Sequence, residues 1–377
     1  MKILLYEEVS SGHHGVVLNY VQTILNRNDI AFVTVSKTLK GSPDGEYAAL
    51  QHTARLHQAD LIHVLSIDGS IRNWLWCKPY HRQDQIPVVA NYYRYDNLHR
   101  PLRRWAWWWM VQRGLVATLL ISDDYWRERR YPARVRACLR FVPDPWWERE
   151  FPRWTLAAAR ERLKLSQSRR VLLLFGEIAW RKGADVLLRA FLETADPATD
   201  LLLLAGRING DLDQTDFNAL LQLGLKAGSV RLDDGFVPEA EVSVYFHACD
   251  AVACAYPAWN QVSSGTFTRA CAAGRPVLAS DAGVTGRTVR ENDLGFLYPA
   301  DDFLALKRAL RAALAEAADR RAEGTFVRAA GAIAKARNLE TYETALLAAY
   351  AELIPKQTSA GRMTAVNPQT VSRSRHD

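Results

Sequence analysis

The chain has 377 residues, of which 49% are hydrophobic and 24% are charged. This composition excludes a disordered chain, and the length favours two α/β domains over a single core. The net charge of +7 favours an anionic partner, either a phosphate-bearing substrate or a lipid surface.

Short apolar, β-branched segments alternate with longer amphipathic segments in the first part of the chain. This alternation predicts a parallel, doubly wound, Rossmann-like sheet over residues 1–142. The strand-like segments are residues 2–8, 30–36, 61–67, 87–93 and 118–124, with helical segments such as 13–26 and 45–58 between them.

The N-terminal segment and the cysteines indicate a cytoplasmic protein. Acidic residues follow MKILLY, where a signal peptide would still be apolar, and no stretch approaches the roughly 20 apolar residues of a membrane-spanning helix. The cysteines form no CxxC pair and several lie in apolar runs, which predicts buried thiols in a reducing compartment. They are Cys77, Cys138, Cys249, Cys254 and Cys271.

Residues 99–113 read HRPLRRWAWWWMVQR and interleave arginine with tryptophan. Indole rings lie at the lipid headgroup boundary and arginine pairs with anionic lipid, so this segment is a candidate for contact with an inner membrane face. The alternative is a core helix, although three consecutive tryptophans cannot all face one side. No nucleic-acid-binding motif accompanies the charge, and we expect no nucleic-acid partner. The basic residues are Arg100, Arg103, Arg104 and Arg113, and the tryptophans are Trp105, Trp107, Trp108 and Trp109.

Three prolines in VPDPWWEREFPRW interrupt the pattern and predict a linker over residues 143–168. A second β–α series then predicts another doubly wound, Rossmann-like domain over residues 169–336. Its strand-like segments are residues 171–176, 200–206, 229–235, 251–257 and 276–281.

The last part of the chain changes character twice. Residues 337–355 predict an amphipathic closing helix. Residues 356–377 lose all apolar periodicity, so we expect a disordered tail. The apolar stripe of the helix is formed by Leu346, Leu347, Tyr350 and Leu353.

A polar loop follows the first strand of the second series. It reads GEIAWRKG and places Lys182 beside the start of a helix, where a lysine can reach a phosphate. Such loops also carry lysine and glycine for turn chemistry alone, so this loop is a weak signal by itself.

A second loop, WNQVSSGTFTR, precedes another helix. If that helix begins near Gly265, the N–H groups of Ser264, Gly265 and Thr266 point toward the edge of the sheet where ligands bind. The hydroxyls of Ser263 and Thr266 would add donors. Together the two loops predict a phosphate site.

Several other chemistries are not indicated. The P-loop and dinucleotide fingerprints are absent. The nine histidines show no HxxxH spacing, and the adjacent pair His13 and His14 is poorly placed to bind one ion. We therefore expect neither a metal nor a bound cofactor.

Four segments of the second half resemble the retaining GT-B glycosyltransferases of family 4 in order and spacing. They are residues 175–191, 233–258, 269–283 and 294–302, and residues 10–25 resemble that family's glycine-rich loop and first helix. The resemblance implies a GT-B fold, with two Rossmann-like domains facing across a crevice. It also implies that the second domain holds the nucleotide-sugar donor and the first domain holds the acceptor. No metal is implied, because protein cations and helix dipoles neutralise the leaving diphosphate.

The site residues follow the family only in part. Gly176 and Lys182 match the family's phosphate loop, but Glu177 stands at the arginine position. Gln261 and Arg269 stand at the positions of two glutamates, of which the first meets the donor sugar and the second the ribose hydroxyls. Glu177 and Arg269 look like a reversal of the family's charges, which predicts that they pair with each other.

The resemblance also implies roles for residues of the first domain and for residues that contact the nucleotide base. Tyr93 falls at the position of the family's histidine near the donor sugar, and Ser11 and Gly12 match the glycine-rich loop in part. Phe236 and Val237 are expected to line the base pocket.

Three functions remain open. The favoured one is a glycosyltransferase that uses Lys182, Gln261 and Tyr93 and acts on a lipid-linked or polysaccharide acceptor, in cell-surface polysaccharide or glycoconjugate synthesis. The second is a non-catalytic homologue that serves as scaffold or regulator of a polysaccharide assembly complex. The third is a sugar epimerase or phosphorylase-like enzyme, which no feature of the sequence favours.

Overall fold

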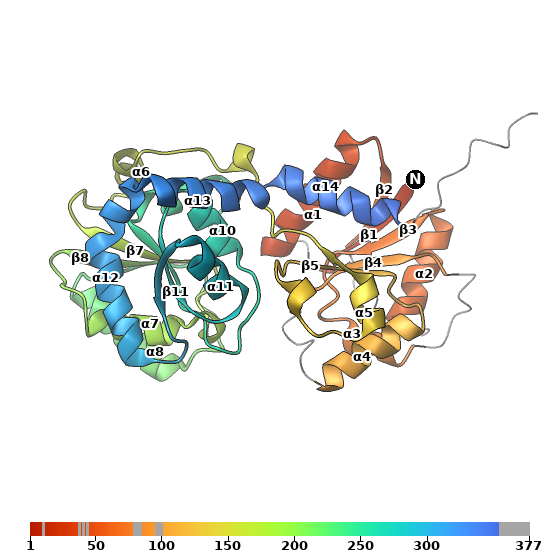
Figure 1. Ribbon diagram of the computed structural model, residues 1–377, viewed down its shortest axis with the longest axis horizontal. Coiled ribbons are helices and arrows are strands. Elements are labelled where there is room, and N and C mark those ends of the chain that lie inside the picture. The colour runs from red at the N-terminus through yellow and green to blue at the C-terminus, as the bar shows by residue number, and fades with distance from the viewer. Residues whose placement is uncertain are drawn as a thin grey trace, which may run out of the picture.

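The protein consists of two parallel sheets, each with helices on both faces, joined side by side (Figure 1). The computed structural model describes residues 1–9, 12–36, 39, 42, 45–77, 85–94 and 101–353. The predicted tail over residues 356–377, Ser11 and Arg100 lie outside the described residues.

The first sheet has six parallel strands in the order β2-β1-β3-β4-β5-β6. Its central strands are buried on both faces, which is why they appear in the sequence as continuous apolar runs. Five of the strands were predicted, and the short edge strand β6 was not. The strands are β1 (Lys2–Tyr6), β2 (Ala31–Val35), β3 (Leu61–Val64), β4 (Val88–Asn91), β5 (Thr118–Ile121) and β6 (Leu139–Phe141).

The second sheet also has six parallel strands, in the order β12-β11-β10-β7-β8-β9. Five were predicted, and the sixth, β12, lies at the edge and is mostly half-buried. The strands are β7 (Arg170–Phe175), β8 (Asp200–Ala205), β9 (Val230–Asp233), β10 (Ala251–Cys254), β11 (Val277–Ser280) and β12 (Gly295–Tyr298). The two sheets confirm the predicted pair of Rossmann-like domains.

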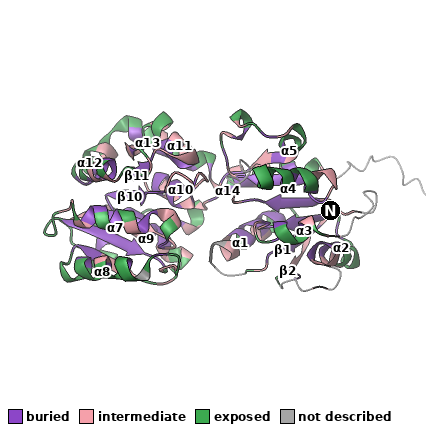
Figure 2. Cartoon of the chain, turned by 90° about the horizontal axis from the view of Figure 1, so that it is seen from below, coloured by how far each residue is buried: buried purple, intermediate pink, exposed green. Residues whose placement is uncertain are grey.

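Helices bury an apolar side against each sheet, and their outer sides are exposed (Figure 2). Those of the first half are α1 (Gly12–Arg27), α2 (Glu46–Leu56), α3 (Ile71–Leu75), α4 (Pro101–Gln112), the 3-10 turn η3 (Trp126–Glu128) and α5 (Ala133–Cys138). Those of the second half are η5 (Trp180–Lys182), α7 (Ala184–Leu192), α8 (Gln214–Lys226), α9 (Glu239–Ala248), α10 (Gly265–Ala272), α11 (Gly283–Asn292), α12 (Phe303–Ala322) and α13 (Gly324–Ala336).

The segment between the sheets is more structured than a plain linker. It contains the 3-10 turn η4 (Glu148–Glu150) and the helix α6 (Leu156–Arg162). Ala159, Leu163 and Leu165 lie in the core of the second half. This part of the chain therefore packs with the second sheet.

The closing helix α14 (Leu339–Ala351) returns to the first half (Figure 1). Leu346 and Tyr350 are fully buried in the same cluster as Ile3 and Val21, and Leu347 and Leu353 pack against it. The predicted apolar stripe is confirmed. The core of the first domain is thus built from both ends of the chain.

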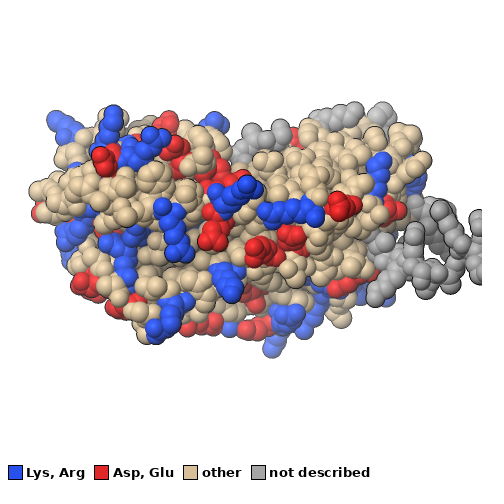
Figure 3. Space-filling model, turned by 90° about the horizontal axis from the view of Figure 1, so that it is seen from above, with Lys and Arg blue, Asp and Glu red and all other residues tan. Residues whose placement is uncertain are grey.

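Polar contacts join the two halves near the carboxyl ends of their strands. The Tyr125 hydroxyl, after β5, lies 2.9 Å from a Glu291 carboxylate oxygen on α11. Arg287 on α11 donates to Glu128 at 2.6 Å. Acidic and basic side chains are intermixed over the junction of the two halves (Figure 3). The carboxyl ends of the strands in the two sheets therefore face each other.

The five cysteines are free thiols. Cys249, Cys254 and Cys271 are buried as predicted, whereas Cys77 and Cys138 are half-buried. Their packing is that of small apolar side chains.

Candidate functional site

Two glycines shape the loop after β7. Gly176 has φ +85°, and a Cβ at this position would lie 2.7 Å from Lys182 Nζ. Gly183 has φ +66°, and its Cβ would lie 2.0 Å from the Ala255 carbonyl oxygen. Both positions favour glycine because of their left-handed backbone, and at Gly183 a Cβ would also clash with the backbone. These glycines let the loop fold back over the end of β7.

Lys182 lies across this strand end. Its Nζ donates to the Phe175 carbonyl at 2.8 Å, and the Thr266 hydroxyl reaches the same carbonyl at 3.5 Å. Burial, with a further contribution from the charge of Arg181, lowers the pKa of Lys182 to about 8. The structure therefore brings together the two loops that sequence analysis predicted as one phosphate site.

The predicted pairing of Glu177 with Arg269 is wrong. Glu177 forms a salt bridge with Arg181, four residues along its own loop, and accepts from Asn209 Nδ2 at 2.6 Å. Burial alone would raise the pKa of Glu177, but the contacts with Arg181 and Asn209 lower it. Arg269 instead donates to Glu239 at 2.7 Å. Glu177 and Arg269 each pair with an opposite charge that lies close in the folded protein. Matching the sequence to a family pattern does not reveal such partners.

The second loop starts a helix where expected. α10 begins at Gly265, and the Ser264 hydroxyl caps it by accepting from the Phe267 N–H at 3.3 Å. The Tyr256 hydroxyl lies 2.5 Å from the same Ser264 oxygen. The Ser263 hydroxyl accepts from Arg337 Nη1 at 2.9 Å. Ser264 therefore serves mainly to build the helix start.

A carboxylate that sequence analysis missed lies at this helix start. A Cβ on Gly265 would be 3.2 Å from Asp144 Oδ2 and 3.2 Å from Arg269 Nη1. Asp144 belongs to the VPDP segment, far from α10 in the sequence. Its negative charge lies where the helix dipole favours an anion.

Gln261 lies against the start of α11. Its side-chain Nε2 is 3.3 Å from the Ala258 carbonyl, and its own carbonyl accepts from the Val284 N–H at 3.2 Å. Gly283 allows this approach, since a Cβ there would be 2.5 Å from the Gln261 Cα. The backbone of Gln261 is therefore fixed.

Two tryptophans that sequence analysis did not single out stack beside these loops. Trp180 and Trp259 have ring centroids 4.9 Å apart and planes 28° apart. The Arg94 guanidinium of the first half lies 5.9 Å from the Trp259 ring centroid. A charge and two rings thus meet between the halves. Only the position of the tryptophans at strand ends could have drawn attention to them.

The first half contributes a polar cluster around Tyr93. The Tyr93 N–H donates to Asp68 at 3.1 Å, and the Tyr93 and His14 rings meet edge to face at 6.4 Å. His14 Nδ1 lies 3.1 Å from Glu7, and this hydrogen bond raises the pKa of His14. Gly12 begins α1, which carries His14. Burial raises the pKa of Tyr93 well above its ordinary value, so its hydroxyl is protonated.

The loop predicted to line the base pocket has one exposed and one half-buried side chain. Phe236 is 61% exposed, whereas Val237 packs against the second core. Glu239, the partner of Arg269, is the first residue of α9, directly after this loop. An exposed phenyl ring near an ion pair can stack on a planar ligand.

Within the described parts of the chain, no three His, Cys, Asp or Glu side chains gather as a ligand set for a metal ion. Of the helices in those same parts, none combines the length and apolarity needed to cross a membrane.

Solved structures place the fold in the GT-B class of glycosyltransferases. Sucrose-phosphate synthase from Thermosynechococcus elongatus superposes with a TM-score of 0.70 at 16% identity, covering 93% of this chain and 98% of that one. Anabaena Alr3699/HepE in complex with UDP gives a TM-score of 0.68 at 15% identity, covering 93% of this chain and 100% of that one. WaaG, a glycosyltransferase involved in lipopolysaccharide biosynthesis, gives 0.61 at 16% identity, covering 93% and 98%.

The second half also matches a sequence family. Residues 169–316 match the model of glycosyl transferases group 1. A D-inositol 3-phosphate glycosyltransferase of Nocardia farcinica is 34% identical over 148 residues, or 37% of this chain and 32% of that protein. The Rhodococcus opacus protein of the same name is 32% identical over 181 residues, or 44% and 40%. The matches thus span between about a third and two fifths of the length of these curated relatives.

Proposed function

We propose that the protein is a glycosyltransferase that moves a sugar from a nucleotide-sugar to an acceptor. The observation that carries the proposal is the convergence of Lys182, Thr266 and the start of α10 at the end of β7, inside the segment that matches glycosyl transferases group 1. The solved structures of Alr3699/HepE with UDP and with UDP-glucose are similar in fold and favour a nucleotide-sugar as the donor.

Each side chain has a role in this proposal. Lys182 leaves the Phe175 carbonyl to contact the diphosphate, and the N–H groups at the start of α10 face the same anion. Phe236 and Val237 line the base. Gln261 and Tyr93 contact the donor sugar. No step needs a metal, because Lys182 and the helix dipole stabilise the leaving diphosphate. We propose retention of configuration, as the family resemblance implies.

The acceptor is proposed to be lipid-linked or a polysaccharide, and α4 is proposed to hold the first half on an anionic membrane face on the cytoplasmic side. Trp107 of α4 is buried, whereas Trp105, Trp108 and Trp109 are exposed. This agrees with the expectation that three consecutive tryptophans cannot all face one side of a helix. Arg103 and Arg104 are exposed on the same helix, which has no acidic residue. The outer side of α4 is exposed (Figure 2).

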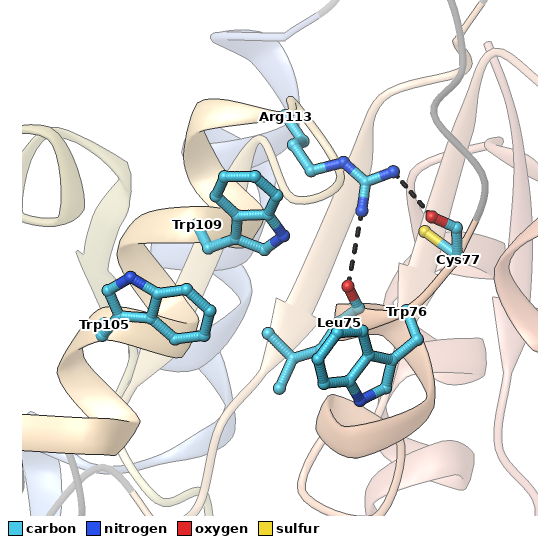
Figure 4. A pocket seen from close by; sticks show the side chains of 6 residues that line it. All are labelled: Leu75, Trp76, Cys77, Trp105, Trp109 and Arg113. Carbon is cyan, nitrogen blue, oxygen red and sulfur yellow. Dashed lines mark hydrogen bonds between the residues drawn. The ribbon is translucent and has the colours of Figure 1, made fainter.

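An aromatic pocket beside α4 supports the membrane proposal. Its volume is about 450 Å³, and Trp76, at its edge, is 82% exposed. Arg113 closes one side by donating to the Cys77 carbonyl at 2.6 Å (Figure 4). Exposed apolar surface beside cations suits the interface of an anionic bilayer. The pocket is lined by Leu75, Trp76, Cys77, Trp105, Trp109 and Arg113.

A panel of UDP-, GDP- and ADP-hexoses with the matching nucleotides tests the donor. Stabilisation follows RT ln(1 + [L]/Kd), so weak ligands raise the Tm at millimolar concentration. We expect one nucleotide and its sugar to raise the Tm, and slow release of free sugar from that donor. A protein that neither responds to the panel nor hydrolyses any donor would contradict the proposed function.

A further inference from the structure

A chain of buried polar side chains runs from the C-terminal helix to Tyr93. The Tyr350 hydroxyl on α14 lies 2.6 Å from His63 Nδ1 on β3. His63 Nε2 lies 3.0 Å from Asn91 Oδ1 at the end of β4. Asn91 Nδ2 then donates to the Tyr93 hydroxyl at 3.2 Å. We call these four residues the relay. Its first step joins residues 287 positions apart in the sequence.

The first hydrogen bonds of the relay have a defined direction. Asn91 Oδ1 can only accept, so His63 Nε2 carries a hydrogen. Burial lowers the pKa of His63 to about 4, so the ring is neutral near pH 7 and Nδ1 carries none. Nδ1 therefore accepts from the Tyr350 hydroxyl. A buried ring with both nitrogens bonded in this way has one tautomer.

The same reasoning fixes the hydroxyl at the far end. Asn91 Nδ2 can only donate, so the Tyr93 oxygen accepts and the Tyr93 hydrogen is directed away from Asn91. The backbone on either side is held as well, because Asp68 accepts from the N–H groups of Tyr93 at 3.1 Å and Arg94 at 2.8 Å. Tyr93 is thus a donor with a fixed position and direction.

We propose that Tyr350, His63 and Asn91 are positioning residues that hold Tyr93 as a directed hydrogen-bond donor to an oxygen of the bound sugar. The inference rests on the proposed function, in which Tyr93 contacts the sugar. Tyr93 follows β4, and its neighbour Arg94 lies over Trp259 of the other half, so the relay ends where the halves meet. A donor already held in place loses little freedom when the sugar binds.

The state of His63 tests the relay without any substrate. We expect nitrogen NMR of the whole protein to show His63 neutral at pH 6–7 with its hydrogen on Nε2. Tyr350→Phe removes the donor to Nδ1, so the hydrogen should be shared between the two ring nitrogens, and the Asn91 amide and the Tyr93 hydroxyl lose their single direction. A hydrogen on Nδ1 in the parent protein would overturn the direction of the relay.

Binding measurements test what the relay does. With UDP-glucose and UDP as probes, or the best-bound pair from the panel, Tyr350→Phe and Tyr93→Phe should each weaken nucleotide-sugar binding about three- to tenfold, the effect of one hydrogen bond. Binding of the nucleotide alone should not change. Tyr47→Phe is the control, since it removes a buried hydroxyl that accepts from Gln51 at 3.2 Å in the same half. Equal losses for nucleotide and nucleotide-sugar, or none in Tyr350→Phe, would overturn the proposal.

Asn91→Asp reverses the last step. A carboxylate accepts from both His63 Nε2 and the Tyr93 hydroxyl, so the Tyr93 hydrogen turns back toward residue 91. This variant should lose the sugar-dependent part of the affinity as fully as Tyr93→Phe while keeping nucleotide binding. Parent-like affinity for the nucleotide-sugar would show that the direction of Tyr93 is unimportant. A parent that binds no member of the panel would contradict the proposed function, and His63 would still report on the relay.

Discussion

The amine of Lys182 is partly buried and is hydrogen-bonded to the Phe175 carbonyl, so its protonation affects stability and ligand binding. Its pKa of about 8 lies below the ordinary 10.5, so the unfolded chain binds more protons between these values. This group therefore adds to the free energy of unfolding as pH rises through that window. A bound phosphate has the opposite effect on the amine, because it favours the charged form.

We predict that nucleotide binding at pH 8 takes up a proton at Lys182 and weakens as pH rises above 8. Calorimetry in buffers with different ionisation enthalpies measures the uptake. Lys182→Ala should abolish it and weaken binding by about 1.5–3 kcal/mol, the range for hydrogen bonds to charged groups. Lys226→Ala, on the last turn of α8, is the matched control. Undiminished proton uptake in Lys182→Ala would assign it to another group.

Asp144 lies at the helix start where we place the diphosphate, so its charge opposes ligand binding. We predict that Asp144→Asn strengthens nucleotide binding by about 1 kcal/mol, the Coulomb energy of two charges roughly 4 Å apart in water. The gain should shrink at high salt. Asp319→Asn, exposed on α12, should have no effect. Weaker binding in Asp144→Asn would mean that Asp144 helps the ligand.

At the residue scale, the two loops of the candidate site could be predicted from the sequence, but the side chains that pair with their charged residues could not. Lys182 and Thr266 could be predicted to meet, because both follow adjacent parallel strands. The partners of Glu177 and Arg269 could not, since side-chain pairing depends on distances of a few ångströms that alignment does not contain. Asp144 was missed for the same reason, because it lies next to α10 only after the chain folds.

At the scale of elements, α10 depends on its cap. We predict that Ser264→Ala lowers the free energy of unfolding by about 1 kcal/mol, the usual effect of losing an N-cap side chain. Nucleotide binding should weaken as well, because the helix start frays. Denaturant unfolding and calorimetry measure the two effects. Ser168→Ala, in an exposed loop, should change neither.

The membrane proposal is tested on α4. We predict that Arg103→Gln with Arg104→Gln weakens binding to anionic vesicles by roughly 1 kcal/mol per charge, and less at high salt. Arg308→Gln with Arg311→Gln on α12 provides the same charge change on the other half. Sedimentation with phosphatidylserine vesicles measures it. Equal losses in both double variants would indicate a general charge effect rather than docking through α4.

Strands were easier to predict than the segments between them. The central strands are buried on both faces and so stand out as apolar runs, whereas β6 has three residues and includes Arg140. α6 was not predicted because the prolines that precede it suggested a linker. Helical geometry predicts that the tryptophans of α4 cannot all be buried. Which of them faces the core depends on how the helix packs on the sheet, and the sequence alone does not give this.

At the scale of the whole molecule, Arg337 ties the halves together. Nearly all of its side chain is buried, and it forms a salt bridge with Asp124 of the first half while donating to Ser263 of the second. Its guanidinium also lies 5.5 Å from the Phe267 ring centroid. We predict that Arg337→Gln lowers the free energy of unfolding by about 1.5–3 kcal/mol.

A double-mutant cycle with Asp124→Asn checks that prediction. Because the two side chains touch, their effects should be non-additive. Arg287→Gln, at the more exposed pair with Glu128, should lower the free energy of unfolding less than Arg337→Gln does. Additive effects of the Arg337 and Asp124 changes would show that the salt bridge does not stabilise the junction.

The packing of α14 against the first half also sets the order in which the two domains fold during synthesis. Domains usually fold as they leave the ribosome, the N-terminal one first. Here the first domain waits for Leu346 and Tyr350 to fill its core, so it is completed only after the whole second domain has been made. A chain truncated after residue 338 should therefore have a protease-resistant second half beside a first half that is still open to digestion.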